Sequence, residues 1–305
     1  MRGASGEARR AAVLGSPIGH SKSPALHAAA YRHLGLEIGY ARIEADETTL
    51  DDFLAGEGAE PGWVGFSVTM PLKAAMVRHM TTSSMRVQDL GVLNTVVIRE
   101  AEEHHGGRRH LHGENTDVDG IVTTLREDGL SRDEPAGGSF AVLGAGGTAA
   151  AALAAAAELG FGRARIYART PEKAAAARPL AQRLGLELMI RPMAELGHDL
   201  ADVRNSVVVS ALPPSAADEL VSQLPPLGVP FPPLLDVAYD PWPSALAAAW
   251  QERGGRVVSG LHMLLHQAVK QVELFTAGTA NPAAELSSAE HARMVDAMRA
   301  AAGLS

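Results

Sequence analysis

Short runs of apolar residues alternate along this chain with segments in which apolar positions recur at helical spacing. In the first third, apolar runs predict strands at 11–14, 39–43, 65–69 and 92–98. Helical segments begin near Pro24 and Leu72, each with a proline at or beside its first position, where the missing N–H breaks no hydrogen bond. This alternation indicates βαβ units around a parallel sheet.

The same alternation continues beyond residue 138. Predicted strands there lie at 141–143, 163–168, 187–190, 207–210 and 234–237. Predicted helices lie at 148–159, 171–184, 245–253, 263–275 and 288–301. The sequence therefore predicts an α/β protein, and a length of 305 residues suits two domains.

A glycine-rich turn indicates where the second domain begins. Gly144, Gly146 and Ala149 fit a G-x-G-x-x-A pattern between a predicted strand and a predicted helix. Glycines in such a turn let backbone N–H groups approach a dinucleotide pyrophosphate at the helix N-terminus. Because the turn lies mid-chain, after a boundary at 128–138, the preceding residues are available to form a substrate domain.

The residues after the next predicted strand bear on the choice between NAD and NADP. An NAD site would present a carboxylate there, whereas this chain has Arg169, Thr170 and nearby Lys173. A guanidinium, a hydroxyl and an ammonium suit a 2′-phosphate, which favours NADP. The alternative is that Arg169 is an ordinary surface residue and Thr170 only a helix N-cap before Pro171.

Composition and charge exclude several classes of function. The chain has no cysteine, which removes disulfides and thiolate chemistry and fits a reducing cytoplasm. A formal net charge of −8 disfavours nucleic acid as a partner. The tail at 1–10 lacks an apolar signal segment, and the alanine-rich run at 149–157 is too short to span a membrane. A cytoplasmic protein without a nucleic-acid or membrane partner is expected.

The segment at 99–112 is polar, rich in histidine and has two glycines at its centre. This composition predicts a long hairpin connection. A metal site needs ligands on rigid elements with further support, so we interpret these histidines as solvated and expect no metal.

Two serines follow the first predicted strand. Ser23 before Pro24 is an ordinary N-cap, and that interpretation leaves Ser21 unexplained. Two hydroxyls two residues apart at a helix N-terminus can bracket a small carboxylate. A carboxylate site is therefore the second interpretation of this turn.

The segment at 65–73 ends a predicted strand and starts a helix. Alternation places Ser67 and Thr69 on one face. Lys73 falls in the first turn of the helix, where the dipole disfavours a cation, so it is either a catalytic residue or a lysine that reaches water.

A further helix start follows the polar hairpin. Asn115 or Thr116 would cap this helix and Asp117 would lie in its first turn, where an anion is favoured. Taken alone, this is a helix cap. Together with Lys73 and Asn94, it offers a Lys–Asp pair and an amide that could hold and protonate a small polyhydroxylated substrate.

As a set, these motifs resemble the shikimate dehydrogenase family closely and over nearly the whole chain. The segments that carry the resemblance, in the family's order, are 21–24, 67–73, 94–95 with 115–117, 144–147 and 260–267. Ser67 is a departure, since many relatives have Asn at this position, which would alter one contact to a ring hydroxyl.

The resemblance implies a role for each motif. Ser21 and Ser23 would bind the substrate carboxylate, and Lys73 and Asp117 would be the catalytic pair. Residues implied to surround the ring hydroxyls are Ser67, Thr69, Asn94, Tyr239 and Gln267. Residues implied to bind NADP are Gly144, Ala145, Gly146, Gly147, Thr148, Arg169, Thr170 and Lys173, with Gly260 and Met263 near the nicotinamide.

The resemblance also implies a fold and a reaction. Residues 1–119 and 259–305 would form an α/β substrate and catalytic domain, interrupted by a Rossmann-like NADP-binding domain at 120–258, so the last helices return to the first domain. The reaction would be reversible NADPH-dependent reduction of 3-dehydroshikimate to shikimate, on the path to chorismate and the aromatic amino acids, in a monomer or homodimer. Either Lys73 donates the proton, which we favour, or it stabilises charge while Asp117 orients it.

Two alternatives differ from this expectation. Relatives that oxidise quinate with NAD tend to have an acidic residue near the position of Arg169 and threonine for serine in the first motif, and this chain has neither. A non-catalytic binding protein on the same fold would have lost Lys73 or Asp117, and both are present.

Overall fold

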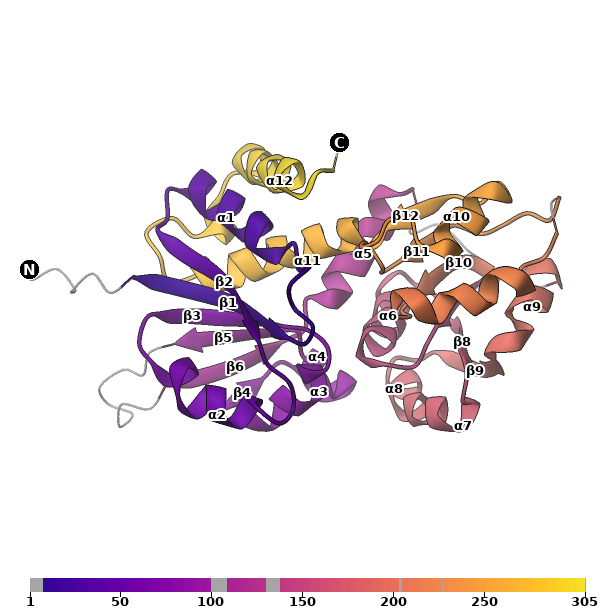
Figure 1. The fold of residues 1–305 in the computed structure, drawn as a ribbon, viewed down its shortest axis with the longest axis horizontal. Coiled ribbons are helices and arrows are strands. Elements are labelled where there is room, and N and C mark those ends of the chain that lie inside the picture. The colour runs from indigo at the N-terminus through magenta and orange to yellow at the C-terminus, as the bar shows by residue number, and fades with distance from the viewer. Residues whose placement is uncertain (1–7, 100–108, 130–137, 203–204, 227, 305) are drawn as a thin grey trace, which may run out of the picture. The chain divides into compact units, whose positions relative to one another are not determined.

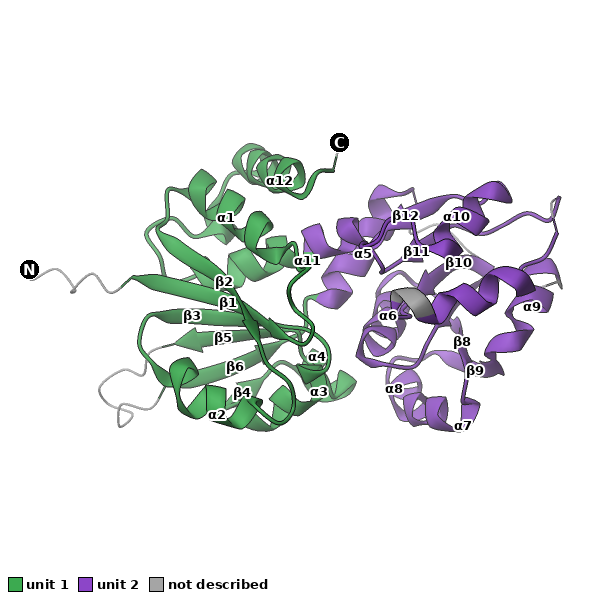
Figure 2. Cartoon of the chain, viewed as in Figure 1, with its two compact units in different colours: residues 1–116, 267–305 green, residues 117–266 purple. Residues whose placement is uncertain are grey.

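The computed structural model describes residues 8–99, 109–129, 138–202, 205–226 and 228–304 (Figure 1). The chain divides into two compact units, one formed by residues 1–116 and 267–305 and the other by residues 117–266 (Figure 2). These ranges describe compactness and do not assign substrate binding or cofactor binding to either unit. The domain assignment made from the sequence, 1–119 with 259–305 and 120–258, therefore stays a prediction.

The first unit is built on a six-stranded sheet of order β2-β1-β3-β5-β6-β4. Its strands are β1 (Arg9–Gly15), β2 (Ile38–Glu44), β3 (Trp63–Val68), β4 (Thr82–Ser83), β5 (Thr95–Arg99) and β6 (His110–Glu114). β1 runs parallel to β2 and β3, whereas β5 runs antiparallel to β3 and to β6. The sheet is thus mixed, and the prediction of a parallel sheet was wrong for β5, because strand direction depends on long-range pairing that the apolar pattern does not encode.

The helices of the first unit come from both ends of the chain. They are α1 (Ser23–Leu34), α2 (Leu50–Ala55), α3 (Leu72–Ala75), α4 (Met85–Leu90), the part of α11 (Gly260–Thr276) from residue 267 onward, and α12 (Ser288–Ala302). Short 3-10 turns are η1 (Glu57–Ala59), η2 (Met76–His79) and η7 (Ala283–Glu285). α12 packs against α1 (Figure 1), which confirms that the last helices return to the first part of the chain.

A buried apolar cluster holds α3 and α4 against the sheet of this unit. Phe66 and Val96 project from neighbouring strands into it, and Leu72 and Val87 reach it from the two helices. Burial of such side chains stabilises each by about 1.5–3 kcal/mol. The turn that carries Lys73 is therefore anchored by the buried Leu72 beside it.

The second unit contains a parallel sheet of order β12-β11-β10-β7-β8-β9. Its strands are β7 (Ser139–Leu143), β8 (Arg163–Ala168), β9 (Glu187–Pro192), β10 (Asn205–Ser210), β11 (Leu234–Asp236) and β12 (Val257–Ser259). This is the strand order of a doubly wound dinucleotide-binding fold, in which ligands bind where the order reverses. Here that point lies between β7 and β10, and the α/β fold class predicted from the sequence is confirmed.

The helices of the second unit are α5 (Asp117–Glu127), α6 (Gly147–Glu158), α7 (Pro171–Ala174), α8 (Arg178–Arg183), α9 (Leu196–Asp202), α10 (Ala245–Glu252) and the start of α11, with 3-10 turns η4 (Ala175–Ala177), η5 (Met193–Glu195) and η6 (Pro214–Gln223). The single helix predicted at 171–184 was wrong. Proline at the start of α8 has no N–H to continue a helix, so the chain passes through η4 there.

The polar hairpin predicted at 99–112 is confirmed where the structure describes it. β5 and β6 pair antiparallel, with Arg99 opposite His110. The tip at 100–108, with two of the four histidines, lies outside the described residues, as do most of the tail at 1–10 and of the boundary at 128–138.

Candidate active site

The N-terminus of α1 holds the first pair of predicted substrate residues. Ser21 and Ser23 are both nearly buried, and the Ser23 N–H donates to Oγ of Ser21 at 3.3 Å. The Arg42 guanidinium donates twice to the Ser21 carbonyl, at 2.9 and 2.6 Å, which fixes this turn. The Ser21 hydroxyl can therefore donate its own hydrogen to an acceptor such as a carboxylate, beside the positive end of the helix dipole.

Ser23 does not cap α1, so the N-cap interpretation was wrong. The helix begins at Ser23 itself, the N-cap residue is Lys22 with helical backbone angles, and no side chain makes a capping bond. The Ser21 side chain forms the turn before the helix instead, and the Ser23 side chain hydrogen bonds with Tyr40. Both hydroxyls of this motif are thus used for something other than capping.

Ser67 and Thr69 lie at the carboxyl end of β3. The Thr69 N–H donates to the Leu14 carbonyl at 2.9 Å, which holds this end against β1. The Tyr40 hydroxyl donates to Oγ of Ser67 at 2.6 Å, and Oγ of Ser67 donates to Oε1 of Gln271 at 2.8 Å. The Ser67 hydroxyl is therefore held from two sides within the protein.

Asn94 connects three segments of the predicted motifs, 94–95, 115–117 and 260–267. Its Oδ1 accepts from the Thr116 N–H at 2.7 Å and from the Thr95 hydroxyl at 2.8 Å. Its Nδ2 donates to Oε1 of Gln267 at 2.6 Å, across 173 positions of sequence. The structure thus brings together Asn94, Thr116 and Gln267, and Asn94 is only 1% exposed.

Lys73 and Asp117, the predicted catalytic pair, each lie next to this arrangement in the chain. Lys73 is half-buried in α3, and its carbonyl accepts from the Leu93 N–H at 3.0 Å, one residue before Asn94. Asp117 is the buried first residue of α5 and directly follows Thr116. The two belong to different units, so their action as a pair stays a prediction.

The glycine turn lies at the point where the strand order of the second unit reverses. Gly144 follows β7 with φ of +104°, a conformation that other residues rarely adopt, and an added Cβ would crowd Leu212 beyond β10. Gly146 precedes α6, which has no side-chain cap, and an added Cβ there would meet no protein atom within 4 Å. The exposed N–H groups at the start of α6 therefore remain accessible to a phosphate.

The predicted 2′-phosphate residues follow β8. Arg169, Thr170 and Lys173 are all exposed, at the end of the strand and in the first turn of α7. Thr170 is the N-cap residue, yet its side chain makes no capping hydrogen bond. Capping alone thus does not account for this threonine. Glu172, which the sequence interpretation did not weigh, is exposed in the same turn.

The loop after β11 carries Tyr239 and is tied at both ends by one carboxylate. Asp236 accepts from the Ala238 N–H at 3.3 Å and from the Ser244 hydroxyl at 2.5 Å, and Ser244 in turn caps α10. Burial raises the pKa of Asp236, against the hydrogen bonds that it accepts. The loop that carries the half-buried Tyr239 is therefore held in place by the hydrogen bonds of Asp236.

Gly260 marks a close approach of two backbone segments. An added Cβ at this position would overlap the carbonyl of Val237, so glycine alone fits at the start of α11. Met263, one turn later, is nearly buried. The structure thus gives a packing reason for Gly260, and the predicted contact of either residue with nicotinamide is untested.

Sequence interpretation missed a group of buried polar residues in the first unit. The His27 ring stacks on Tyr40 at 4.0 Å between centroids, and its two nitrogens lie 3.1 Å from the Tyr31 hydroxyl and 3.3 Å from Oε1 of Gln271. Burial lowers the pKa of His27 to about 3 and raises the pKa of Tyr40. The available signal was polar residues at the buried positions of α1 and α11.

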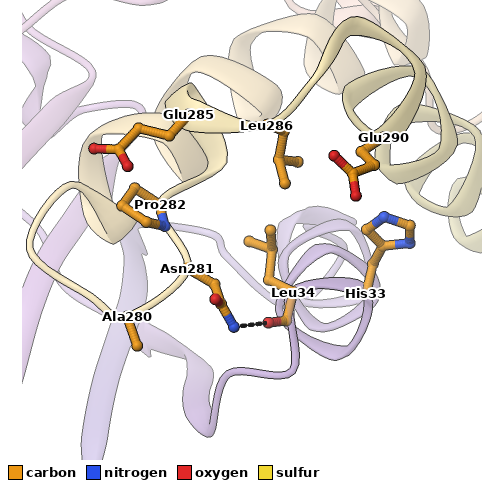
Figure 3. A pocket seen from close by; sticks show the side chains of 8 residues that line it. All are labelled: His33, Leu34, Ala280, Asn281, Pro282, Glu285, Leu286 and Glu290. Atoms are coloured by element: carbon orange, nitrogen blue, oxygen red, sulfur yellow. Dashed lines mark hydrogen bonds between the residues drawn. The ribbon is translucent and has the colours of Figure 1, made fainter.

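A surface hollow of about 370 Å³ lies elsewhere on the first unit (Figure 3). It is lined by the end of α1 and the segment leading into α12, where Asn281 Nδ2 donates to the Leu34 carbonyl at 3.0 Å. None of the predicted site residues lines it.

Two negative observations apply to the part of the chain that the structure describes. No group of three or more His, Asp or Glu side chains there is placed to hold a metal ion. No helix there has the length and apolar character needed to cross a membrane.

Comparison with known proteins agrees with this geometry. Residues 13–96 match the shikimate dehydrogenase substrate binding domain. The chain is 35% identical over 267 residues to the NADP(+) shikimate dehydrogenase of Methylobacterium radiotolerans, covering 87% of this chain and 90% of the relative. The chain belongs to the shikimate dehydrogenase family.

Solved structures of the family are similar to the whole chain. Shikimate dehydrogenase of Mycobacterium tuberculosis is 39% identical with a TM-score of 0.76, covering 97% of this chain and 98% of that one. The enzyme of Thermus thermophilus, solved in complex with NADP(H) and shikimate, is 29% identical with a TM-score of 0.72, covering 96% and 99%. The residues of this shikimate dehydrogenase homologue that match the family's substrate domain include Ser21, Ser67, Lys73 and Asn94.

Proposed function

We propose that this chain catalyses the reversible NADPH-dependent reduction of 3-dehydroshikimate to shikimate. The observation that carries the proposal is the side-chain amide of Asn94, which binds both Thr116 and Gln267. Three segments that carry the family resemblance, 94–95, 115–117 and 260–267, are thereby joined by hydrogen bonds. Membership in the shikimate dehydrogenase family and a relative's complex with NADP(H) and shikimate support the same reaction.

In this proposal the substrate carboxylate binds at the start of α1. Ser21 has a hydroxyl hydrogen to donate, and the helix has no acidic residue in its first turn to oppose an anion. The resemblance also implies Ser23 as a carboxylate ligand, a role that requires its hydroxyl to turn from Tyr40 toward the substrate. A carboxylate held at this point leaves the ring hydroxyls to the other polar residues, which are Ser67, Thr69, Asn94, Tyr239 and Gln267.

Lys73 is the proposed proton donor. Reduction of a ketone creates an alkoxide, and a positioned ammonium both stabilises this charge and supplies the proton. Asp117 would orient the ammonium. In the oxidation direction Lys73 accepts the proton from the substrate hydroxyl, and Asp117 again orients it.

The turn at 144–148 would hold the pyrophosphate of NADPH. Its fit to a phosphate is indicated by the open space at Gly146 and by a helix start without a side-chain cap. Arg169, Thr170 and Lys173 would bind the 2′-phosphate, with Gly260 and Met263 near the nicotinamide. When bound, NADPH supplies the hydride, and the protein supplies alignment and the proton.

The experiment is a reductase assay on 3-dehydroshikimate with NADPH and with NADH, beside oxidation of shikimate and quinate. Turnover of 3-dehydroshikimate with a preference for NADPH is the expected result. Preferential oxidation of quinate with NAD would replace the proposal with the quinate alternative. A protein that binds NADPH but turns over none of these substrates would overturn the proposal.

We also propose a setting for this activity. The enzyme would act in the cytoplasm on the path to chorismate and the aromatic amino acids, as a monomer or homodimer. Light scattering after size-exclusion chromatography distinguishes these states, and a larger assembly would contradict both.

A further inference from the structure

We propose that Tyr40, Gln271 and His27 are positioning residues that fix the direction of the Ser67 hydroxyl, so that Ser67 accepts a hydrogen bond from one ring hydroxyl of the substrate. This inference rests on the proposed function and deepens it by assigning the chemistry of one substrate contact. Tyr40, Gln271 and His27 all belong to the first unit and are proposed to affect the substrate through Ser67.

The donor and acceptor roles in this group of hydrogen bonds are set first by the orientation of the Gln271 amide. Its nitrogen lies 3.2 Å from the carbonyl oxygen of Asn94 and 3.0 Å from the Thr95 hydroxyl. A backbone carbonyl only accepts, so the group facing it must be the NH₂ of the amide. The amide oxygen Oε1 therefore points to the opposite side, where it can only accept.

The orientation of Gln271 sets the direction of the next hydroxyl. Oγ of Ser67 lies 2.8 Å from Oε1 of Gln271, and so Ser67 must donate its single hydrogen there. The Tyr40 hydroxyl, 2.6 Å away, must in turn donate to Ser67. Ser67 keeps one lone pair and has no hydrogen left to give.

His27 contacts both residues that bind the Ser67 hydroxyl, Gln271 and Tyr40. Its Nε2 also faces Oε1 of Gln271, at 3.3 Å, and so carries the hydrogen, which leaves Nδ1 to accept from the Tyr31 hydroxyl at 3.1 Å. The ring stacks on Tyr40 at 19° between planes, which holds the tyrosine that donates to Ser67. With the pKa of His27 lowered to about 3 by burial, the ring stays neutral and the direction persists near neutral pH.

Gln267 presents a hydrogen-bond donor to a ligand, whereas Ser67 presents an acceptor. The Thr116 backbone N–H only donates, so Oδ1 of Asn94 faces it at 2.7 Å and Nδ2 of Asn94 must donate to Oε1 of Gln267. Gln267 is half-buried and keeps its NH₂ for a ligand. The site thus combines an acceptor at Ser67 with a donor at Gln267, and a substrate must match both.

A substrate that lacks the hydroxyl facing Ser67 would leave a buried acceptor unpaired, which enzymes discriminate against strongly. The test compares kcat/KM for shikimate with kcat/KM for two analogues, each lacking one of the two ring hydroxyls that do not react. For one analogue we expect a preference for shikimate of roughly 100-fold or more. Equal use of all three compounds would overturn the inference.

Two variants connect this preference to the positioning residues. Gln271→Met and Tyr40→Phe each release the Ser67 hydroxyl, and each should reduce the preference by about tenfold, with the larger part of the change in KM. Gln88→Met, at an exposed position of α4, is the matched control and should leave the preference unchanged. An unchanged preference in folded Gln271→Met protein would show that Ser67 is directed by something else.

The direction of these hydrogen bonds can also be tested in the unsubstituted protein, without measuring the activity of a variant. Nitrogen-15 spectra of the unsubstituted protein, with His27 assigned by a His27→Gln variant, should show hydrogen on Nε2 and none on Nδ1. Hydrogen on Nδ1 would contradict the direction of the bonds that lead from His27 through Gln271 to Ser67 and overturn the inference, even if Gln271→Met did not fold. Failure of the wild-type protein to oxidise shikimate would instead overturn the proposed function and leave this spectroscopic result to be judged separately.

Discussion

The Leu93 N–H donates to the Lys73 carbonyl at 3.0 Å, which ties the turn of the proposed proton donor to the residue before Asn94. Leu93 is fully buried, as is Leu72 on the other side of Lys73. A catalytic group needs support of this kind, because small displacements reduce its effect. The backbone that carries Lys73 is thus positioned by the same part of the fold that positions Asn94.

Replacement of Lys73 tests its role directly. Lys73→Ala should lower kcat by roughly 10²–10⁴-fold, the usual contribution of a positioned general acid. Binding of NADPH, followed by its fluorescence, should be unchanged. Lys270→Ala, at an exposed position of α11, is the control and should remain fully active. Near-normal turnover by Lys73→Ala would remove this lysine from the mechanism.

Arg169 decides the cofactor preference in our proposal. Arg169→Ala removes a charged donor from the 2′-phosphate, and the ratio of kcat/KM with NADPH to that with NADH should fall by about 10–100-fold. Arg178→Ala provides a matched loss of an exposed arginine nearby. If the ratio is the same in all three proteins, the specificity for NADP has another origin.

Asn94 should matter for both stability and activity. Asn94→Ala leaves buried partners without hydrogen bonds, and the free energy of unfolding should fall by about 2–4 kcal/mol. Urea denaturation measures this change, and kcat/KM for shikimate should fall as well. Asn281→Ala, at an exposed residue that makes one part-buried bond to the Leu34 carbonyl, should lower the free energy of unfolding far less. Equal losses in the two variants would contradict a special role for Asn94.

Buried His27 predicts acid sensitivity of folding. The pKa of His27 is about 3 in the folded protein, against an ordinary value of 6.5, so below pH 6.5 the unfolded chain binds a proton that the folded protein does not. Stability is therefore fully present above pH 6.5 and declines as the pH falls toward 3. By pH 5 this single group should have removed about 2 kcal/mol.

Urea denaturation at several pH values checks the slope. His27→Gln should flatten it, although its stability at neutral pH will be lower. His33→Gln, at an exposed position of the same helix, should leave the slope unchanged. A parallel decline in all three proteins would assign the acid sensitivity to other groups.

Local patterns predicted most of the framework. The alternation of apolar runs predicted the strands before and after the glycine turn at 144–147, and this turn indicated a second α/β unit in the later part of the chain. The helix at 171–184 was wrong because one proline outweighs a long alanine-rich pattern. The antiparallel β5 was missed because strand direction depends on long-range pairing that periodicity does not encode.

The candidate site residues were likewise predicted from the sequence only in part. Lys73 stands out because a cation is disfavoured in the first turn of a helix, Asp117 because it follows a helix-capping motif, and Asn94 because it lies within a short motif. Tyr40 and Gln271 belong to no motif, and the sequence pattern alone does not show that they share a neighbour. Only the fold brings them to Ser67, across up to 204 positions of sequence.

Thr116 and Gln267 are the two residues at which the chain leaves and re-enters the first unit, and one side chain, that of Asn94, holds both. The residues at 117–266 are thus inserted between two points that lie close together. A short linker could join these points in an engineered protein, because insertions at adjacent chain ends can be removed without rebuilding the host. Under the proposed function, such a protein would keep the carboxylate site at the start of α1 and lack the glycine turn proposed for NADPH.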